Sequence, residues 1–253
     1  MIDKMKCAVL AEELRARFNT NNLAPMDVFA LSRTVPHLST VLFPFGQAIS
    51  GLCIKNERYS LVAINSAQTY GRQRFTLAHE LYHLYFDKQS GTIICPSDSS
   101  RASNIEREAD SFASFFLLPR LALKNELVIH GISKDAPMND GLLKGIFEIE
   151  QKYEVSRGAL LVRLEDEEAI TPQQKTWLSS DIKRNARHLG FSTNLYERRQ
   201  GSDAKKTDGY YLDLISDLLA NNAISRGKAK ELLSDGFRDD IHVIELEGDD
   251  ILD

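Results

Sequence analysis

Cysteine is scarce in this chain of 253 residues, and long apolar runs are missing. The three cysteines, Cys7, Cys53 and Cys95, are odd in number and far apart, which excludes a disulfide framework. No run of about 18 apolar residues occurs, so we expect no membrane-spanning helix. The opening stretch MIDKMKCAVLAEELRARFN carries charges every few positions and therefore lacks the apolar centre of a signal peptide. Together these absences predict a cytoplasmic protein without a membrane partner.

An excess of positive charge is missing as well. The chain has 31 Lys and Arg residues against 36 Asp and Glu residues, which gives a net charge of −5. Dedicated nucleic-acid-binding proteins are usually basic overall, so this class is disfavoured. Two stretches, SDIKRNARH and ERRQGSDAKK, are locally basic, and a weak nucleic-acid contact or a partner surface is one interpretation of them. The acidic balance of the whole chain favours the other interpretation, a solvated face.

The pattern of apolar residues predicts a mostly helical α+β protein. A helical period runs over residues 3–18 and returns from about residue 71, with RQRFTLAHELYHLYF and NIEREADSFASFFLLP as the clearest helices. Between these regions, residues 39–65 hold three short segments rich in β-forming residues, STVLFPF, GLCIKN and YSLVAIN. They predict a small antiparallel sheet. The Ser-rich stretch DKQSGTIICPSDSSRAS, which lies between the two clearest helices, predicts a loop.

The charged stretch EDEEAITPQQ predicts a boundary between two parts, residues 1–166 and residues 167–253. In the second part, ERRQGSDAKKTDG predicts exposed turns, whereas YYLDLISDLLANNAISRGKAKELLSDG predicts a pair of helices. We therefore expect a helical C-terminal extension with a regulatory or substrate-binding role.

The stretch HELYH, residues 79–83, carries the clearest chemical signal. His79 and His83 are four residues apart, so they share one helix face and can converge on one zinc ion. Glu80 then lies beside the metal, where it can take a proton from a bound water and later deliver it to a leaving amine. The pattern is short, and a surface helix with two solvated histidines is the alternative. The surrounding apolar residues favour a buried helix, whose imidazoles need polar partners.

The helix that follows supplies a third ligand. In IEREAD, Glu106 and Asp110 are four residues apart and share a face, whereas Glu108 points about 200° away from Glu106 at 100° per residue. We assign Glu106 as a zinc ligand and Asp110 as the acceptor for the second ring nitrogen of His79 or His83. Without the two histidines, a solvated acidic face at a helix N-terminus would be the better interpretation.

The stretches RQRFTLAHELYH and IEREADSFASFFLLP resemble the ImmA/IrrE family of zinc metallopeptidases. The resemblance covers roughly residues 20–165, from APMDVFAL to VSRGALLVRL. It implies a cytoplasmic enzyme with a zincin-like, gluzincin-type domain in residues 1–166, with zinc ligands at His79, His83 and Glu106 and a general base at Glu80. It also implies a protein substrate, typically a helix-turn-helix transcriptional repressor encoded nearby, whose cleavage switches on stress, prophage or defence genes.

Four further residues are candidates for this site. Cys95 lies between the two ligand helices, and its thiolate could bind zinc as a fourth, inhibitory ligand; a buried apolar cysteine is the alternative, and the one that we favour from the sequence. An oxyanion donor is needed in many peptidases of this type, and His188, Tyr210 and Tyr211 are candidates from the C-terminal part.

Two functional hypotheses therefore stand. The first is a zinc-dependent endopeptidase in which Glu80 activates the water that attacks the scissile carbonyl. The second is a metal-containing antirepressor, or another binding module, that acts without proteolysis. The intact Glu80 argues for the first hypothesis, because a purely structural metal site does not need a base at that position.

Overall fold

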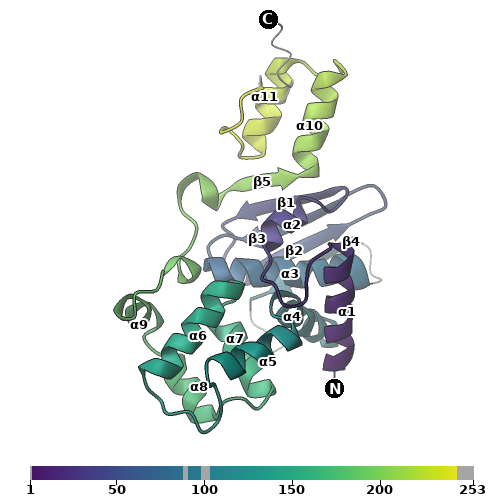
Figure 1. Ribbon diagram of the computed structural model, residues 1–253. Helices are drawn as coiled ribbons and strands as arrows, with labels where there is room; N and C mark the ends of the chain where they lie inside the picture. The colour runs from purple at the N-terminus through teal and green to yellow at the C-terminus, as the bar shows by residue number, and fades with distance from the viewer. Residues whose placement is uncertain (1, 88–90, 98–102, 244–253) are drawn as a thin grey trace, which may run out of the picture.

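A five-stranded sheet lies at the centre of the computed structural model, which describes residues 2–87, 91–97 and 103–243 (Figure 1). Its strands are β1 (Leu38–Phe43), β2 (Ile49–Lys55), β3 (Ser60–Asn65), β4 (Gly91–Pro96) and β5 (Lys206–Gly209). The spatial order is β4-β2-β3-β1-β5, so β4 and β5 form the two edges. The predicted α+β class with a small sheet is confirmed.

The sheet is mixed, which corrects the antiparallel arrangement that we predicted. β2 and β3 form the expected hairpin, but β3 lies between β2 and β1, and it runs parallel to β1 with Leu38 opposite Ser60. The connection from β1 to β2 therefore passes over the position that β3 later fills. The other pairings, β1 with β5 and β2 with β4, are antiparallel.

Both edge strands lie in segments that the sequence analysis assigned to loops or exposed turns. β4 falls within the Ser-rich stretch after the HELYH helix, and β5 within the polar stretch ERRQGSDAKKTDG. Each is short and largely exposed or half-buried, with a single buried residue, Cys95 in β4 and Thr207 in β5. Their strand conformation depends on pairing with β2 and β1 rather than on local sequence preference.

Helices pack on the sheet and on one another. In chain order they are α1 (Lys4–Arg17), α2 (Val28–Ser32), α3 (Tyr70–Phe86), α4 (Asn104–Leu117), α5 (Arg120–Ile129), α6 (Asp140–Tyr153), α7 (Arg157–Asp166), α8 (Pro172–Leu178), α9 (Ile182–His188), α10 (Tyr210–Ala220) and α11 (Arg226–Asp235). The central helix α3 lies against β2 and β3, and α4 packs between α3 and α1 (Figure 1). Because α3 is covered on several sides, almost all of its residues from Gly71 to His83 are buried.

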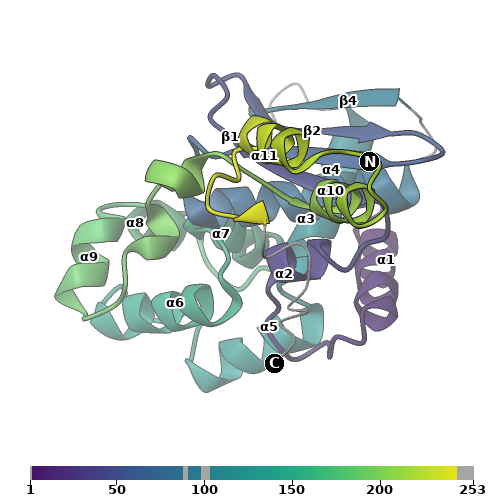
Figure 2. The same cartoon turned by 90° about the horizontal axis from the view of Figure 1, so that it is seen from above.

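The later helices form a second layer beside this centre. α6, α8 and α9 gather on the side of the molecule opposite α1 (Figures 1 and 2). The main apolar core continues through Leu178, Ala186 and Tyr196, which lie after the predicted boundary at residue 166. A buried ion pair strengthens this part, since Glu150 on α6 accepts from the guanidinium of Arg157 on α7 and from the hydroxyl of Tyr196.

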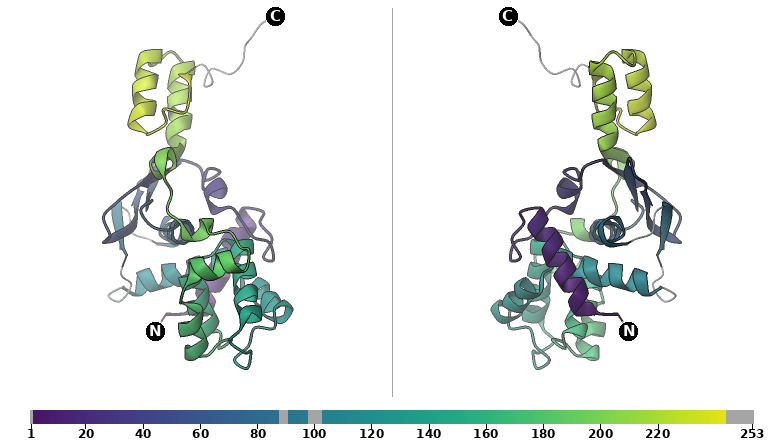
Figure 3. Two further views of the ribbon diagram at one scale, coloured as in Figure 1. Left: turned by 90° about the vertical axis from the view of Figure 1, so that its left-hand side faces the viewer. Right: turned by 90° about the vertical axis from the view of Figure 1, so that its right-hand side faces the viewer.

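The predicted helical pair near the C-terminus is confirmed as α10 and α11. These two helices stand apart at one end of the molecule, beyond β5 (Figures 1 and 3). They share a small core of their own, formed by Ile215, Leu219, Ala229 and Leu233. None of the helices in the described part of the chain is both long enough and apolar enough to span a bilayer.

Candidate metal centre

Helix α3 places the three residues of the HELYH stretch inside the protein. His79 is 6% exposed, and Glu80 and His83 are completely buried. One helical turn separates the two histidines, and their Nε2 atoms lie 3.2 Å apart. Two ring nitrogens that face each other at this distance form a favourable arrangement when both donate their lone pairs to one cation.

Helix α4 brings a carboxylate to the same point. The side chain of Ser103 caps α4 by accepting from the backbone N–H of Glu106, which fixes the first turn of the helix. Glu106 Oε2 then lies 3.2 Å from His79 Nε2, and its Oε1 lies 3.4 Å from His83 Nε2. The structure thus brings together the three residues that the sequence analysis predicted as zinc ligands.

The remaining ring nitrogens are held by two aspartates. His79 Nδ1 lies 2.9 Å from Asp110 Oδ1, and His83 Nδ1 lies 3.1 Å from Asp87 Oδ2. A carboxylate at Nδ1 keeps the proton on that nitrogen and leaves the lone pair of Nε2 for a metal. Asp110 therefore has the position proposed for it, with His79 as its partner. Asp87 was missed, although its spacing of four residues from His83 was a usable signal.

Cys95 completes a group of four donor atoms. The Sγ of Cys95 and the ligand atoms of His79, His83 and Glu106 all lie within 4.8 Å of one another. Ligands at 2.0–2.3 Å from a tetrahedral zinc ion are separated from one another by about 3.3–3.8 Å. Two nitrogens, one oxygen and one sulfur atom form a donor set that suits zinc, so the residues present fit such an ion.

Glu80 lies beside this group and against the sheet. Neither of its carboxylate oxygens has a hydrogen-bond partner of normal geometry among the described residues, although the Cys95 thiol is close enough to influence its pKa. Burial raises the pKa of Glu80 to about 7, against the opposing effect of His79. Burial, and then the neighbouring Glu80, raise the pKa of the Cys95 thiol. A carboxyl with a pKa near neutrality can both accept and return a proton.

Gly51 on β2 makes room for the Glu80 carboxylate. A Cβ atom at position 51 would lie 2.7 Å from Glu80 Oε1 and 2.6 Å from the Cγ2 atom of Thr76. A side chain is therefore excluded where β2 passes over α3. The position of the Glu80 carboxylate, the candidate general base, therefore depends on a glycine at position 51 of the sheet. The sequence pattern alone gave no sign of this dependence.

The three residues suggested as oxyanion donors lie elsewhere. The side chain of His188 is 71% exposed at the end of α9. The hydroxyl of Tyr211 donates to the carbonyl of Leu232 within the C-terminal helical pair, and the ring of Tyr210 packs edge-on against His37. The structure brings none of them to the His79 cluster, because α9 and α10 lie on other sides of the molecule (Figure 1).

One narrow cavity adjoins the donor atoms, and a larger one lies next to it. A narrow one of about 10 Å³ is lined by His79, Glu106 and Asp110, together with Arg72 and Phe75. The second has a volume of about 470 Å³ and shares Arg72, Phe75 and Asp110 with the first.

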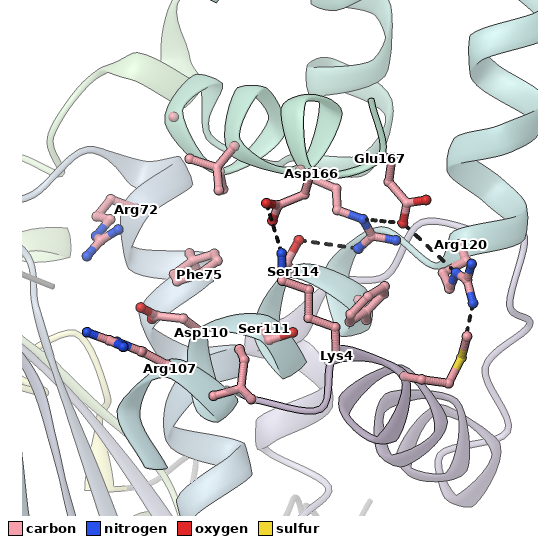
Figure 4. Close-up of a pocket in the computed structure, with 17 residues that line it drawn as sticks. Lys4, Arg72, Phe75, Arg107, Asp110, Ser111, Ser114, Arg120, Asp166 and Glu167 are labelled. Carbon is pink, nitrogen blue, oxygen red and sulfur yellow. Dashed lines mark hydrogen bonds and ion pairs between the residues drawn. The ribbon is translucent and has the colours of Figure 1, made fainter. Parts of the chain in front are cut away.

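Figure 4 shows the layout of the larger cavity. Arg72 and Arg107 lie at one end, beside Phe75 and Asp110. At the other end, Arg120 and Glu167 belong to an ion-paired group. Arg72 and Arg107, for which no ion pair is seen among the described residues, therefore lie at the end of the larger cavity that adjoins the narrow one.

Comparison with known proteins agrees with this geometry. None of the curated proteins compared with this chain matches it. The family model of the M78 peptidases, described as the IrrE N-terminal-like domain, matches residues 38–165. The matched region begins at β1 and ends in α7, so it contains all four donor residues, Glu80 and both aspartates. The chain therefore belongs to the ImmA/IrrE family of M78 peptidases, which supports a metallopeptidase type of function.

Proposed function

We propose that this protein is a zinc-dependent endopeptidase. The observation that carries the proposal is the convergence of His79, His83 and Glu106. The Nδ1 atoms of the two histidines are held by aspartates, and the buried Glu80 lies next to the donor group. Zinc, when bound, supplies a Lewis acid that polarises the scissile carbonyl and lowers the pKa of water. A structural zinc site would have no use for an unpartnered buried carboxylate beside its ligands.

The chain's own residues support the remaining steps. Glu80 takes the proton from the attacking water, and it returns a proton to the amine nitrogen as the peptide bond breaks. Asp110 and Asp87 hold the orientation of the two imidazoles through their Nδ1 atoms. The burial of α3 limits the access of bulk water to Glu80 and the two histidines, which strengthens electrostatic interactions within the site.

The cavities suggest where a substrate lies. A side chain next to the scissile bond can enter the 470 Å³ cavity, whose apolar residues include Phe75, Phe115 and Val162. Arg72 and Arg107, for which no ion pair is seen among the described residues, favour a substrate with an acidic group near this side chain. We further propose that the substrate is a helix-turn-helix repressor and that the reaction takes place in the cytoplasm, as the family resemblance implies.

A matched pair of variants tests the function. Wild-type protein, Glu80→Gln and Glu108→Gln are each loaded with zinc and incubated with helix-turn-helix regulators encoded beside the gene. Glu108 is the control, because it lies on α4 near the site but outside the donor group. We expect fragments with the wild type and the control only, with equal zinc content in all three proteins.

The same experiment separates proteolysis from the antirepressor hypothesis. If Glu80→Gln releases the repressor from its operator as well as the wild type does, and no fragments appear by mass spectrometry, the protein acts by binding. Fragments that persist in Glu80→Gln at the wild-type rate would contradict the role of Glu80 as general base.

A further inference from the structure

Cys95 lies on the edge strand nearest to the donor atoms. It is 1% exposed, whereas its neighbours Ile94 and Pro96 are exposed, so the alternation of β4 turns the thiol inward. Cys95 pairs with Gly51 on β2, the residue whose missing side chain leaves space for Glu80. The inner face of β4 therefore presents the thiol to the site.

The pairing of β2 with β4 is irregular at this point. Ile49 is opposite Pro96 and Gly51 is opposite Cys95, so Ser50 is an extra residue in β2. The hydroxyl of Ser50 lies 3.1 Å from the carbonyl oxygen of Cys95 and 3.2 Å from that of Pro96. Such bulges bend a strand and redirect its side chains, and they are frequent beside active sites. Here the Ser50 hydroxyl donates to the two backbone carbonyls that follow the Cα of Cys95.

The other buried cysteine of the sheet shows that burial alone does not explain this placement. Cys53 also lies on β2 and is completely buried, with a pKa that burial raises to about 12. Its sulfur is not among the converging donor atoms, whereas that of Cys95 is. A cysteine that merely filled apolar space would not need its sulfur within 4.8 Å of two imidazole nitrogens and a carboxylate oxygen.

We propose that Cys95 binds the zinc ion as a fourth ligand and keeps the enzyme latent until β4 moves away. This inference rests on the proposed function, since it concerns the regulation of the same site. With four protein ligands the coordination is that of a closed, structural zinc site, and no position is left for the attacking water. Glu80 then lies next to the Cys95 thiolate and has no metal-activated water from which to take a proton.

The position of β4 makes such a release feasible. β4 pairs with β2 on one side only, because it is an edge strand, and among the described residues no strand lies on its other side. Moving it breaks one ladder and the two contacts of the Ser50 hydroxyl, while the helices that carry His79, His83 and Glu106 keep their packing. A protein partner that pairs with the edge of the sheet is one kind of ligand that could do this.

Cobalt substitution of the full-length protein tests the inference. A thiolate ligand gives cobalt(II) an intense near-ultraviolet charge-transfer band, which nitrogen and oxygen ligands do not give. We expect this band in the wild type, its loss in Cys95→Ala and its retention in the control Cys53→Ala. We also expect Cys95→Ala to keep its zinc and to cleave its substrate faster than the wild type does.

X-ray absorption of the zinc-loaded wild type gives an independent answer if Cys95→Ala does not fold. One sulfur neighbour at about 2.3 Å is expected. A wild-type protein that binds metal without a sulfur neighbour and without the charge-transfer band would overturn the inference, yet leave the endopeptidase proposal standing. Loss of cleavage in Glu80→Gln supports the proposed function whichever result is obtained for Cys95.

Discussion

Replacing Gly51 by alanine tests whether the sheet determines the position of the general base. The added methyl group would lie 2.6 Å from Thr76 Cγ2, 2.7 Å from Glu80 Oε1 and 3.0 Å from the carbonyl oxygen of Ala63. The methyl group is confined by the backbone of Ala63 on one side and by side chains of α3 on the other, so neighbouring atoms must shift to accommodate it. Either the Glu80 carboxylate retreats or β2 separates from α3.

The size of the effect follows from the overlap. To reach ordinary contact at 3.4 Å from its present 2.7 Å, Glu80 Oε1 must shift by about 0.7 Å. A misplacement of about 1 Å can cost about 100-fold in rate, so we expect kcat to fall by about 10- to 100-fold. Overpacking of this kind also lowers the free energy of unfolding by about 1–3 kcal/mol. Zinc content should stay unchanged, because none of the three atoms nearest to the new methyl group belongs to a predicted zinc ligand.

The assay compares Gly51→Ala with Gly46→Ala. Gly46 lies in the connection between β1 and β2, and no atom lies within 4 Å of a Cβ at that position. Both variants are measured for kcat on the substrate identified with the Glu80 variants, for zinc content and for Tm. If Gly51→Ala has the kcat and Tm of the wild type, the close approach of β2 to Glu80 is wrong.

Three further changes probe the surroundings of the site. Asp110→Asn should weaken zinc binding by about 10- to 100-fold in competition with a chelating dye, because His79 loses its carboxylate partner; unchanged affinity would contradict that role. Glu150→Ala leaves the buried Arg157 uncompensated and should cost about 3–5 kcal/mol in urea unfolding, whereas a loss near zero would show that water reaches the pair. A chain ending after Gly209 keeps β5 but loses the hydrogen bonds from Arg238 to Thr207 and Asp208, so its Tm should fall slightly. A chain ending after Lys205 also lacks β5 and should aggregate; equal behaviour of the two would mean that β5 adds little.

The helical half of the site could be predicted because its geometry is local. Residues four apart share a face of a helix wherever the helix lies, so the pairing of His79 with His83, and of Glu106 with Asp110, followed from spacing alone. Asp87 is likewise four residues from His83, whose Nδ1 atom it contacts. That residue was overlooked because it follows the last helical residue of α3, where the apolar period had already ended.

The sheet's contribution could not be predicted in the same way. Whether Cys95 reaches the donor group depends on which strand pairs with β2 and on the bulge at Ser50, and neither is encoded within the few residues around it. Gly51 has the same limitation, since its role becomes visible only when β2 crosses α3. The same limitation applies to Tyr211, whose hydroxyl donates to the carbonyl of Leu232 inside the C-terminal helical pair.

The pairing of β1 with β5 has a consequence for biosynthesis. Ser39 lies opposite Gly209, so the outer edge of β1 gains its neighbour only after synthesis has reached β5. During translation, the N-terminal half can assemble β1, β2 and β3 while one backbone edge remains open to pairing with other nascent chains. A chain released before β5 is complete would therefore carry a sheet with one unpaired edge, which is open to self-association.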